Sequence, residues 1–139
     1  MRTLCRKGIS MVMNELSILE RSALNAILDE LGQGRTEIED QVLRASVVAR
    51  ENTGGGFLTK LALKGEVPVH LQNSRLGENV WIAIKGMRHG LGMILHLWKD
   101  KMPLLEGYAV GPENTLPIDF EQTIFEIVTE PGPFPENVS

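Results

Sequence analysis

The chain lacks the cysteines that form disulfides, the long apolar runs that span membranes, and a large excess of charge of either sign. It contains one cysteine, Cys5, so an intrachain disulfide is excluded, and a single thiol is typical of a reducing compartment. No apolar run approaches the ~20 residues that a membrane-spanning helix needs. Acidic residues outnumber basic ones, 18 to 14, for a formal net charge of −4. Nucleic-acid affinity comes mainly from cations that neutralise phosphates, so we predict no nucleic-acid partner for this acidic chain. The single cysteine and the lack of a long apolar run lead us to predict a cytoplasmic protein that does not bind a membrane.

Motifs that carry chemistry are scarce as well. The triple glycine at 54–56 lacks the context of a phosphate-binding loop, since Lys60 follows Thr59 in reversed order and a strand is expected next. We interpret these glycines as a hinge from helix to sheet. The three histidines, at 70, 89 and 96, do not have the spacing of metal ligands. The sequence therefore predicts no cofactor and no metal, and it favours a protein without enzymatic activity.

The length and composition indicate one globular domain. The chain has 139 residues, of which 42% are hydrophobic and 23% charged, so it can bury a core without a disulfide or a structural metal. We expect a flexible N-terminal extension over residues 1–13, a single α+β domain over 14–130, and a C-terminal tail over 131–139. Three prolines exclude regular structure from that tail.

Two amphipathic helices are predicted in the first half. The first spans about 14–31, with apolar residues at helical spacing and a capping box made by Ser17 and Glu20. The acidic residues of this segment, Glu20 among them, are assigned to its wet face. The second helix spans about 37–50. Because only residues 32–35 join the two, we expect them to pack as a helical hairpin.

After residue 52 the apolar pattern changes to the alternation of strands. Short polar turns at 86–90 and 99–101 imply antiparallel neighbours. Because helices precede strands, the predicted fold is α+β, with the N-terminal helical hairpin packed on one face of a largely antiparallel meander of four to five strands. The expected strands are 57–64, 80–85, 91–98, 102–110 and 122–129, with a loop over 65–78.

A carboxylate and a histidine interrupt the apolar strands. Burying Glu106 is costly unless it is paired. The turn at 99–101 brings His96 near it across the hairpin. Glu106 is therefore either solvated, on the wet side of a one-sided sheet, or paired with His96, Arg88 or Arg50.

Aromatic residues add a candidate surface. We expect Trp81, Trp98 and Tyr108 to share one sheet face, where aromatics form a binding surface or, alternatively, a small core under the helices. Strand parity favours the face away from the core for Trp81 if its neighbours Val80 and Ile82 point inward. The predicted functional surface consists of Arg50, Trp81, His89, His96, Trp98, Glu106 and Tyr108.

Three segments carry a resemblance to a known family. They are Thr-Gly-Gly-Gly-Phe at 53–57, His-Gly-Leu-Gly-Met-Ile-Leu at 89–95 and Leu-Glu-Gly-Tyr at 105–108. In this pattern the chain resembles a family of small uncharacterised bacterial proteins with a Thr-Gly-x-Gly-Phe segment and a hairpin ending in Leu-Glu-Gly-Tyr. The resemblance implies a helical N-terminal half followed by strands, and it implies no activity. Pro103 departs from the simple Asp-Gly turn that would be expected between the two strands of this hairpin.

These observations lead to three functional hypotheses. The first is a non-enzymatic bacterial protein that binds another protein, in one version an immunity-type or inhibitor protein whose acidic side chains attract a basic toxin. The alternative is a small-ligand-binding protein or hydrolase-type enzyme with a pocket between helices and sheet, using Arg50, His96, Glu106 and Tyr108. The third is a homodimer formed through an exposed strand.

Overall fold

The computed structural model describes residues 14–135, so Cys5, the predicted extension over 1–13 and the last four residues of the tail lie outside it. The helical elements are α1 (Ile18–Asp29), η2 (Gly32–Glu37), α2 (Glu39–Leu43) and η3 (Val69–Leu71). The strands are β1 (Asn14–Glu15), β2 (Ser46–Asn52), β3 (Gly56–Ala62), β4 (Ser74–Leu76), β5 (Trp81–Ile84), β6 (Leu91–Leu97), β7 (Leu104–Ala109) and β8 (Phe125–Val128).

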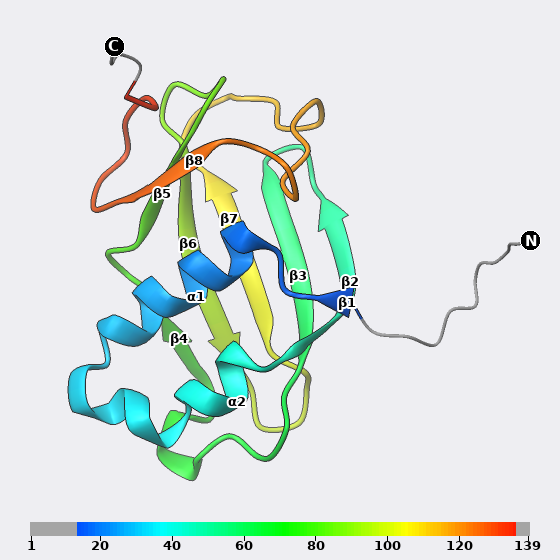
Figure 1. Ribbon diagram of the computed structural model, residues 1–139, viewed down its shortest axis with the longest axis vertical. Helices are drawn as coiled ribbons and strands as arrows, with labels where there is room; N and C mark the ends of the chain where they lie inside the picture. Colours follow the sequence, from blue (N-terminus) through cyan, green and yellow to red (C-terminus); the bar gives the residue numbers. More distant parts are fainter. Residues whose placement is uncertain (1–13, 136–139) are drawn as a thin grey trace, which may run out of the picture.

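All eight strands belong to one open sheet, and every pairing is antiparallel. The order is β1-β2-β3-β7-β6-β5-β8, and β4 pairs with β6 beyond the end of β5. The helices α1 and α2 lie together on one face of this sheet (Figure 1). The predicted α+β class with an antiparallel sheet is thus confirmed, whereas four to five strands was too few.

The predicted second helix is wrong over its C-terminal half. The segment forms η2 and the short α2, and the chain then enters β2, which pairs along its length with β3. β-branched Val47 and Val48 favour a strand there. A register shift between Val47 and Ala49 interrupts the alternation that would have indicated the strand. The N-terminal half is therefore not a pair of long helices, and the glycines at 54–56 turn a hairpin rather than join helix to sheet.

The first helix begins as the sequence predicts. The backbone N–H of Glu20 donates to the Ser17 hydroxyl at 3.1 Å, and the Ser17 N–H donates to a Glu20 carboxylate oxygen at 2.8 Å. One stripe of α1, including Leu24, Ile27 and Leu28, is fully buried against the sheet. The facing residues of β6 are Leu91, Met93, Leu95 and Leu97, all with no exposed surface.

The remaining strands match their predicted positions within a few residues. The predicted loop over 65–78 also contains η3 and β4, the latter held to β6 by the pairs Ser74↔Leu97 and Leu76↔Leu95. A three-residue strand carries too little alternation to be predicted from the sequence.

The long segment between β7 and β8 is pinned to the tip of the β2–β3 hairpin. The Asn52 amide donates to the carbonyl oxygens of Thr115 at 2.8 Å and Ile118 at 3.1 Å. The fully buried Thr115 hydroxyl donates to Asn52 and accepts the N–H of Gly56 at 3.0 Å. This network holds the segment beside the start of α1.

Candidate functional site

One face of the sheet carries no helix formed by residues 14–135, and it gathers most of the predicted site residues. Along β6 and β7 the buried leucines point toward α1, so the alternate residues lie on the other side. We call this side the outer face; its central residues are Leu58, Trp81, Ile94, His96, Trp98, Leu104, Glu106 and Tyr108. Five of the seven predicted site residues thus share one surface. All eight central residues are partly exposed.

Glu106 is paired with His96. The carboxylate oxygen Oε1 lies 2.8 Å from His96 Nε2, and the two side chains retain 35% and 16% of their exposure. The residue directly opposite Glu106 is Ile94, so the contact between His96 and Glu106 runs diagonally across the hairpin. Of the partners considered for Glu106, the structure selects His96.

Two aromatic clusters flank this pair. Trp98 stacks on the His96 ring at 5.3 Å and 8°, and the Lys101 ammonium lies 4.8 Å from the Trp98 ring centre. At the other end Trp81 meets Tyr108 edge-on at 5.6 Å. Gly92 lies under Tyr108, where an added Cβ would approach the ring to 2.3 Å. A glycine at 92 therefore lets the tyrosine lie against the sheet.

Charged side chains lie at both ends of the outer face. Lys60 and Arg75 flank the His96–Leu104 pair, and Lys101 continues this basic end. At the Trp81 end, Glu126 pairs with Ala83 of β5. Glu78 lies beside a depression of about 250 Å³ that Arg75, Ile94 and Tyr108 also line. The outer face therefore carries charges of both signs, and its basic side chains gather at the His96 end.

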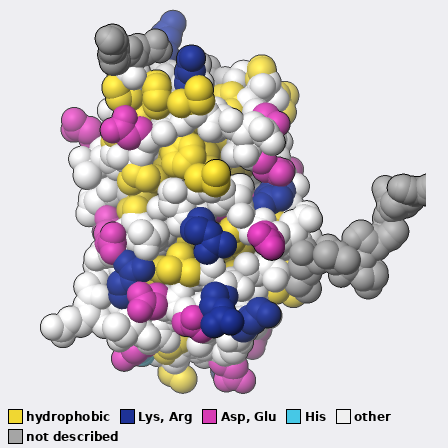
Figure 2. Space-filling view, in the orientation of Figure 1, with side chains coloured by type: hydrophobic (Ala, Val, Ile, Leu, Met, Phe, Trp, Pro, Cys, Tyr) yellow, Lys and Arg dark blue, Asp and Glu magenta, His cyan; other side chains and the backbone are white. Residues whose placement is uncertain are grey.

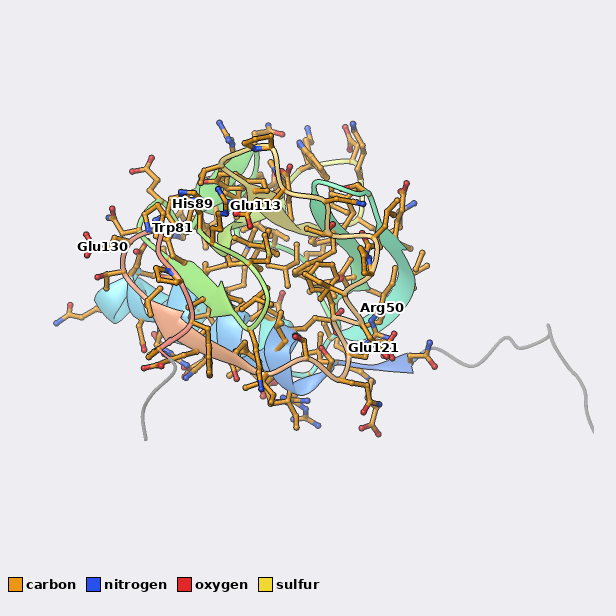
Figure 3. All side chains as sticks on the ribbon, turned by 90° about the horizontal axis from the view of Figure 1, so that it is seen from above. Arg50, Trp81, His89, Glu113, Glu121 and Glu130 are labelled. Carbon is orange, nitrogen blue, oxygen red and sulfur yellow. The ribbon has the colours of Figure 1, made fainter. Side chains whose placement is uncertain are left out.

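His89 lies apart from this surface. It belongs to the β5–β6 turn, where the Glu113 carboxylate accepts the backbone N–H groups of Arg88 at 2.7 Å and His89 at 3.0 Å. The His89 ring lies 3.3 Å from the same carboxylate (Figure 3). These contacts fasten the turn to the segment after β7.

Arg50 lies on the opposite, helix-bearing side of the sheet. Its Nε and Nη2 donate to the two oxygens of Glu20 at 2.8 and 2.9 Å. The Thr59 hydroxyl donates to Glu20 at 2.8 Å, and Glu20 is only 3% exposed. Arg50 therefore does not converge with His96, Glu106 and Tyr108 on one cleft.

The electrostatics of this pair favour both charged forms. Burial alone would raise the pKa of Glu20, but hydrogen bonds from Arg50, the Ser17 N–H and Thr59 outweigh it, so the pKa is lowered. The hydrogen bond to Glu20 raises the pKa of Arg50.

The prediction that Glu20 lies on the solvent-exposed face of the helix was wrong, because its side chain is buried. A signal was present: Glu20 precedes Ala23, Leu24 and Ile27 by three, four and seven positions, which places it on the apolar stripe.

A pocket of about 250 Å³ opens beside this pair, between the start of α1, the β2–β3 hairpin and residues 118–121. Its apolar lining includes Leu19, Phe57, Ile118 and Phe120. We call it the acidic pocket, because its lining holds four acidic residues and one basic residue: Glu20, Glu51, Asp119, Glu121 and Arg50. On this face charged side chains of both signs are intermixed over the helices, and apolar side chains gather above them (Figure 2).

Comparison of the chain with protein-family models, curated proteins and solved structures gives no match in any of the three. The family resemblance noted above stays a prediction. Within residues 14–135, no helix is long and apolar enough to cross a membrane. Over the same residues, no three His, Cys, Asp or Glu side chains are grouped closely enough to hold a metal ion.

Proposed function

We propose that this protein is a non-enzymatic protein-binding module and that the outer face is its binding surface. The observation that carries the proposal is the asymmetry of the sheet. Helices cover one face, whereas the other presents Trp81, Tyr108 and Trp98, over which the described part of the chain places no helix. Aromatic side chains bury a large area with little loss of side-chain entropy, which makes them effective anchors in interfaces.

The occupant that best fits this face is a second copy of the chain. A two-fold axis lying in the plane of the face and perpendicular to the strands places the basic end of one copy over the Trp81 end of the other. Arg75 of each copy then approaches Glu78 and Glu126 of its partner, because all three lie on the β5 side of the face. A partner whose surface carries charge of only one sign would not match this face, which carries both signs.

The expected association is weak. Neighbouring strands lie about 4.8 Å apart and residues rise about 3.3 Å, so the patch over β3, β7, β6 and β5 measures roughly 20 Å in each direction. Two copies would bury on the order of 800–1,200 Å² in total, the size of transient interfaces. We therefore expect a reversible dimer with a dissociation constant in the micromolar range.

Ile94→Lys is expected to abolish this dimer. Ile94 lies at the centre of the outer face, opposite Glu106 and between the two aromatic clusters, so the substitution replaces an apolar contact with an ammonium that is costly to bury in the interface. Sedimentation equilibrium from about 1 µM to about 1 mM measures the association. Ile18→Lys is the matched control, because Ile18 is 77% exposed at the start of α1. A wild-type protein that stays monomeric throughout, or an Ile94→Lys variant that dimerises like the control, contradicts the proposal.

The ligand-binding or hydrolase hypothesis has less support. It required Arg50 to share one cleft with His96, Glu106 and Tyr108, and the sheet separates Arg50 from the other three. Arg50 is also engaged by Glu20, the Glu15 carbonyl and Glu121, which leaves it little capacity to bind a substrate. The immunity-type hypothesis requires an acidic surface, and on the outer face basic side chains accompany the acidic ones.

A further inference from the structure

The acidic pocket has the shape of a receptor for one long side chain. It lies on the helix-bearing side of the sheet, away from the outer face. Its apolar wall includes Phe57 and Phe120, whose ring centres are 4.9 Å apart, together with Ile118. A volume of about 250 Å³ is below that of most cofactor and drug-sized ligand sites. The space suits a single side chain or a small fragment.

The charges in the acidic pocket favour a cation. Glu20 and Arg50 neutralise each other through two short hydrogen bonds. Two acidic side chains remain at the rim: Glu121, 3.5 Å from Arg50 Nη1, and Asp119, which accepts the Glu121 N–H at 3.0 Å. Glu51 pairs with Leu58, so its side chain lies on the outer face. Arg50 and Glu121 lie side by side in Figure 3, on the opposite edge of the molecule from Trp81. The lining therefore keeps an excess of negative charge at its rim.

Arg50 does not make the acidic pocket an anion site. Its Nε donates to Glu20, and its Nη2 donates to both Glu20 and the Glu15 carbonyl oxygen at 2.8 Å. An incoming carboxylate would have to displace Glu121 from Nη1 while facing Asp119. Repulsion from these groups disfavours that arrangement.

We infer that the acidic pocket receives one lysine or arginine side chain presented by a partner protein. The methylene stem packs on Phe120 and Ile118, and the charged head reaches Glu121 and Asp119 at the rim. An apolar wall with a carboxylate rim matches the two ends of such a side chain. This site goes beyond the self-association proposed above and does not depend on it, because the two surfaces lie on opposite sides of the sheet.

Backbone NMR titration with short peptides tests the inference. The probes are acetyl-Gly-Lys-Gly-amide, its norleucine analogue without the ammonium, its glutamate analogue, and n-butylammonium as a free amine. We expect the lysine peptide to bind in the millimolar range and to shift the amides of residues 50–52, 57–59 and 118–121. The norleucine and glutamate peptides are expected to bind at least several-fold more weakly.

Two variants make the test specific to the acidic pocket. Glu121→Gln removes a carboxylate at the rim of the pocket and is expected to lower the affinity for the lysine peptide roughly two- to fivefold. Glu66→Gln changes the net charge equally at an exposed loop position and is expected to have no effect. Equal binding of the norleucine peptide, shifts confined to other residues, or equal weakening by both variants overturns the inference. Binding of n-butylammonium as tightly as the lysine peptide overturns the assignment to a protein side chain. Sedimentation of the same samples reports separately on the outer face.

Discussion

Replacing Arg50 with methionine is expected to lower the free energy of unfolding by about 3–5 kcal/mol, the range for breaking a buried ion pair from one side. The substitution keeps the apolar stem but leaves the Glu20 carboxylate, 3% exposed, with only the Ser17 N–H and the Thr59 hydroxyl as donors. It also releases the contacts that tie β2 to the start of α1. Urea denaturation at pH 7, followed by far-UV circular dichroism, measures the change.

Arg44→Met is the matched control for this prediction. Arg44 also pairs with a carboxylate, Asp40, at 3.4 Å, but both side chains are largely exposed. Exposed ion pairs contribute about 0–1 kcal/mol. If the two variants lose the same stability, the Glu20–Arg50 pair has no special role in holding the fold.

The same pair predicts how stability depends on pH. The pKa of Glu20 in the folded protein is below its ordinary value of 4.5, so the unfolded chain takes up a proton first as pH falls. The stabilisation by the charged form is complete above 4.5 and is lost as pH falls through the lowered value. We therefore expect the stability gap between wild type and Arg50→Met to narrow from pH 7 toward pH 3. Urea midpoints at several pH values measure it, and a gap independent of pH would contradict the assignment.

Gly56→Ala is expected to destabilise the protein by roughly 3–5 kcal/mol, from backbone strain and overpacking together. Gly56 has φ of +140°, and an added Cβ would lie 1.9 Å from the carbonyl oxygen of Gly107 on β7. The neighbouring atoms are backbone, so they give way only if β3 separates from β7. The same movement would break the bond from the Gly56 N–H to the Thr115 hydroxyl.

Gly55→Ala tests whether this effect belongs to position 56. No atom lies within 4 Å of a Cβ built on Gly55, and the residue is exposed at the hairpin tip. We expect a change within about 0.5 kcal/mol. Thermal unfolding of both variants makes the comparison. Should Gly56→Ala fail to fold, the soluble yield of Gly55→Ala under the same conditions provides the reference. Equal loss in both variants would show that flexibility of the tip, rather than close packing at Gly56, requires the glycines.

The strands were predictable because their signal is local. The alternation along 91–98 and 102–110 and the polar turn between them indicate an antiparallel hairpin, which places His96 near Glu106. The same alternation places the aromatic residues on a shared face. Residues 46–52 were misassigned because the bulge after Val47 removes the alternation, while the alanines at 45 and 49 suit a helix equally well.

The contacts between Glu20 and Arg50 could not be predicted from the sequence, for a different reason. They join residues 30 positions apart across the helix–sheet boundary. Their meeting depends on where α1 lies over β2, which no local period encodes. The acidic pocket likewise depends on the segment after β7, and the side chains that pin it there, Asn52 and Thr115, are 63 positions apart.

The place of β7 in the sheet has a consequence for how the chain is made. β7 lies between β3 and β6 and is the strand that joins the half built from β1, β2 and β3 to the half built from β6, β5 and β4. It is also the seventh of eight strands to leave the ribosome. Until Leu104–Ala109 emerges, the nascent chain holds two separate hairpin assemblies whose inner strand edges are open. The sheet can therefore become continuous only after β7 has been made, and β8 then adds to its β5 edge.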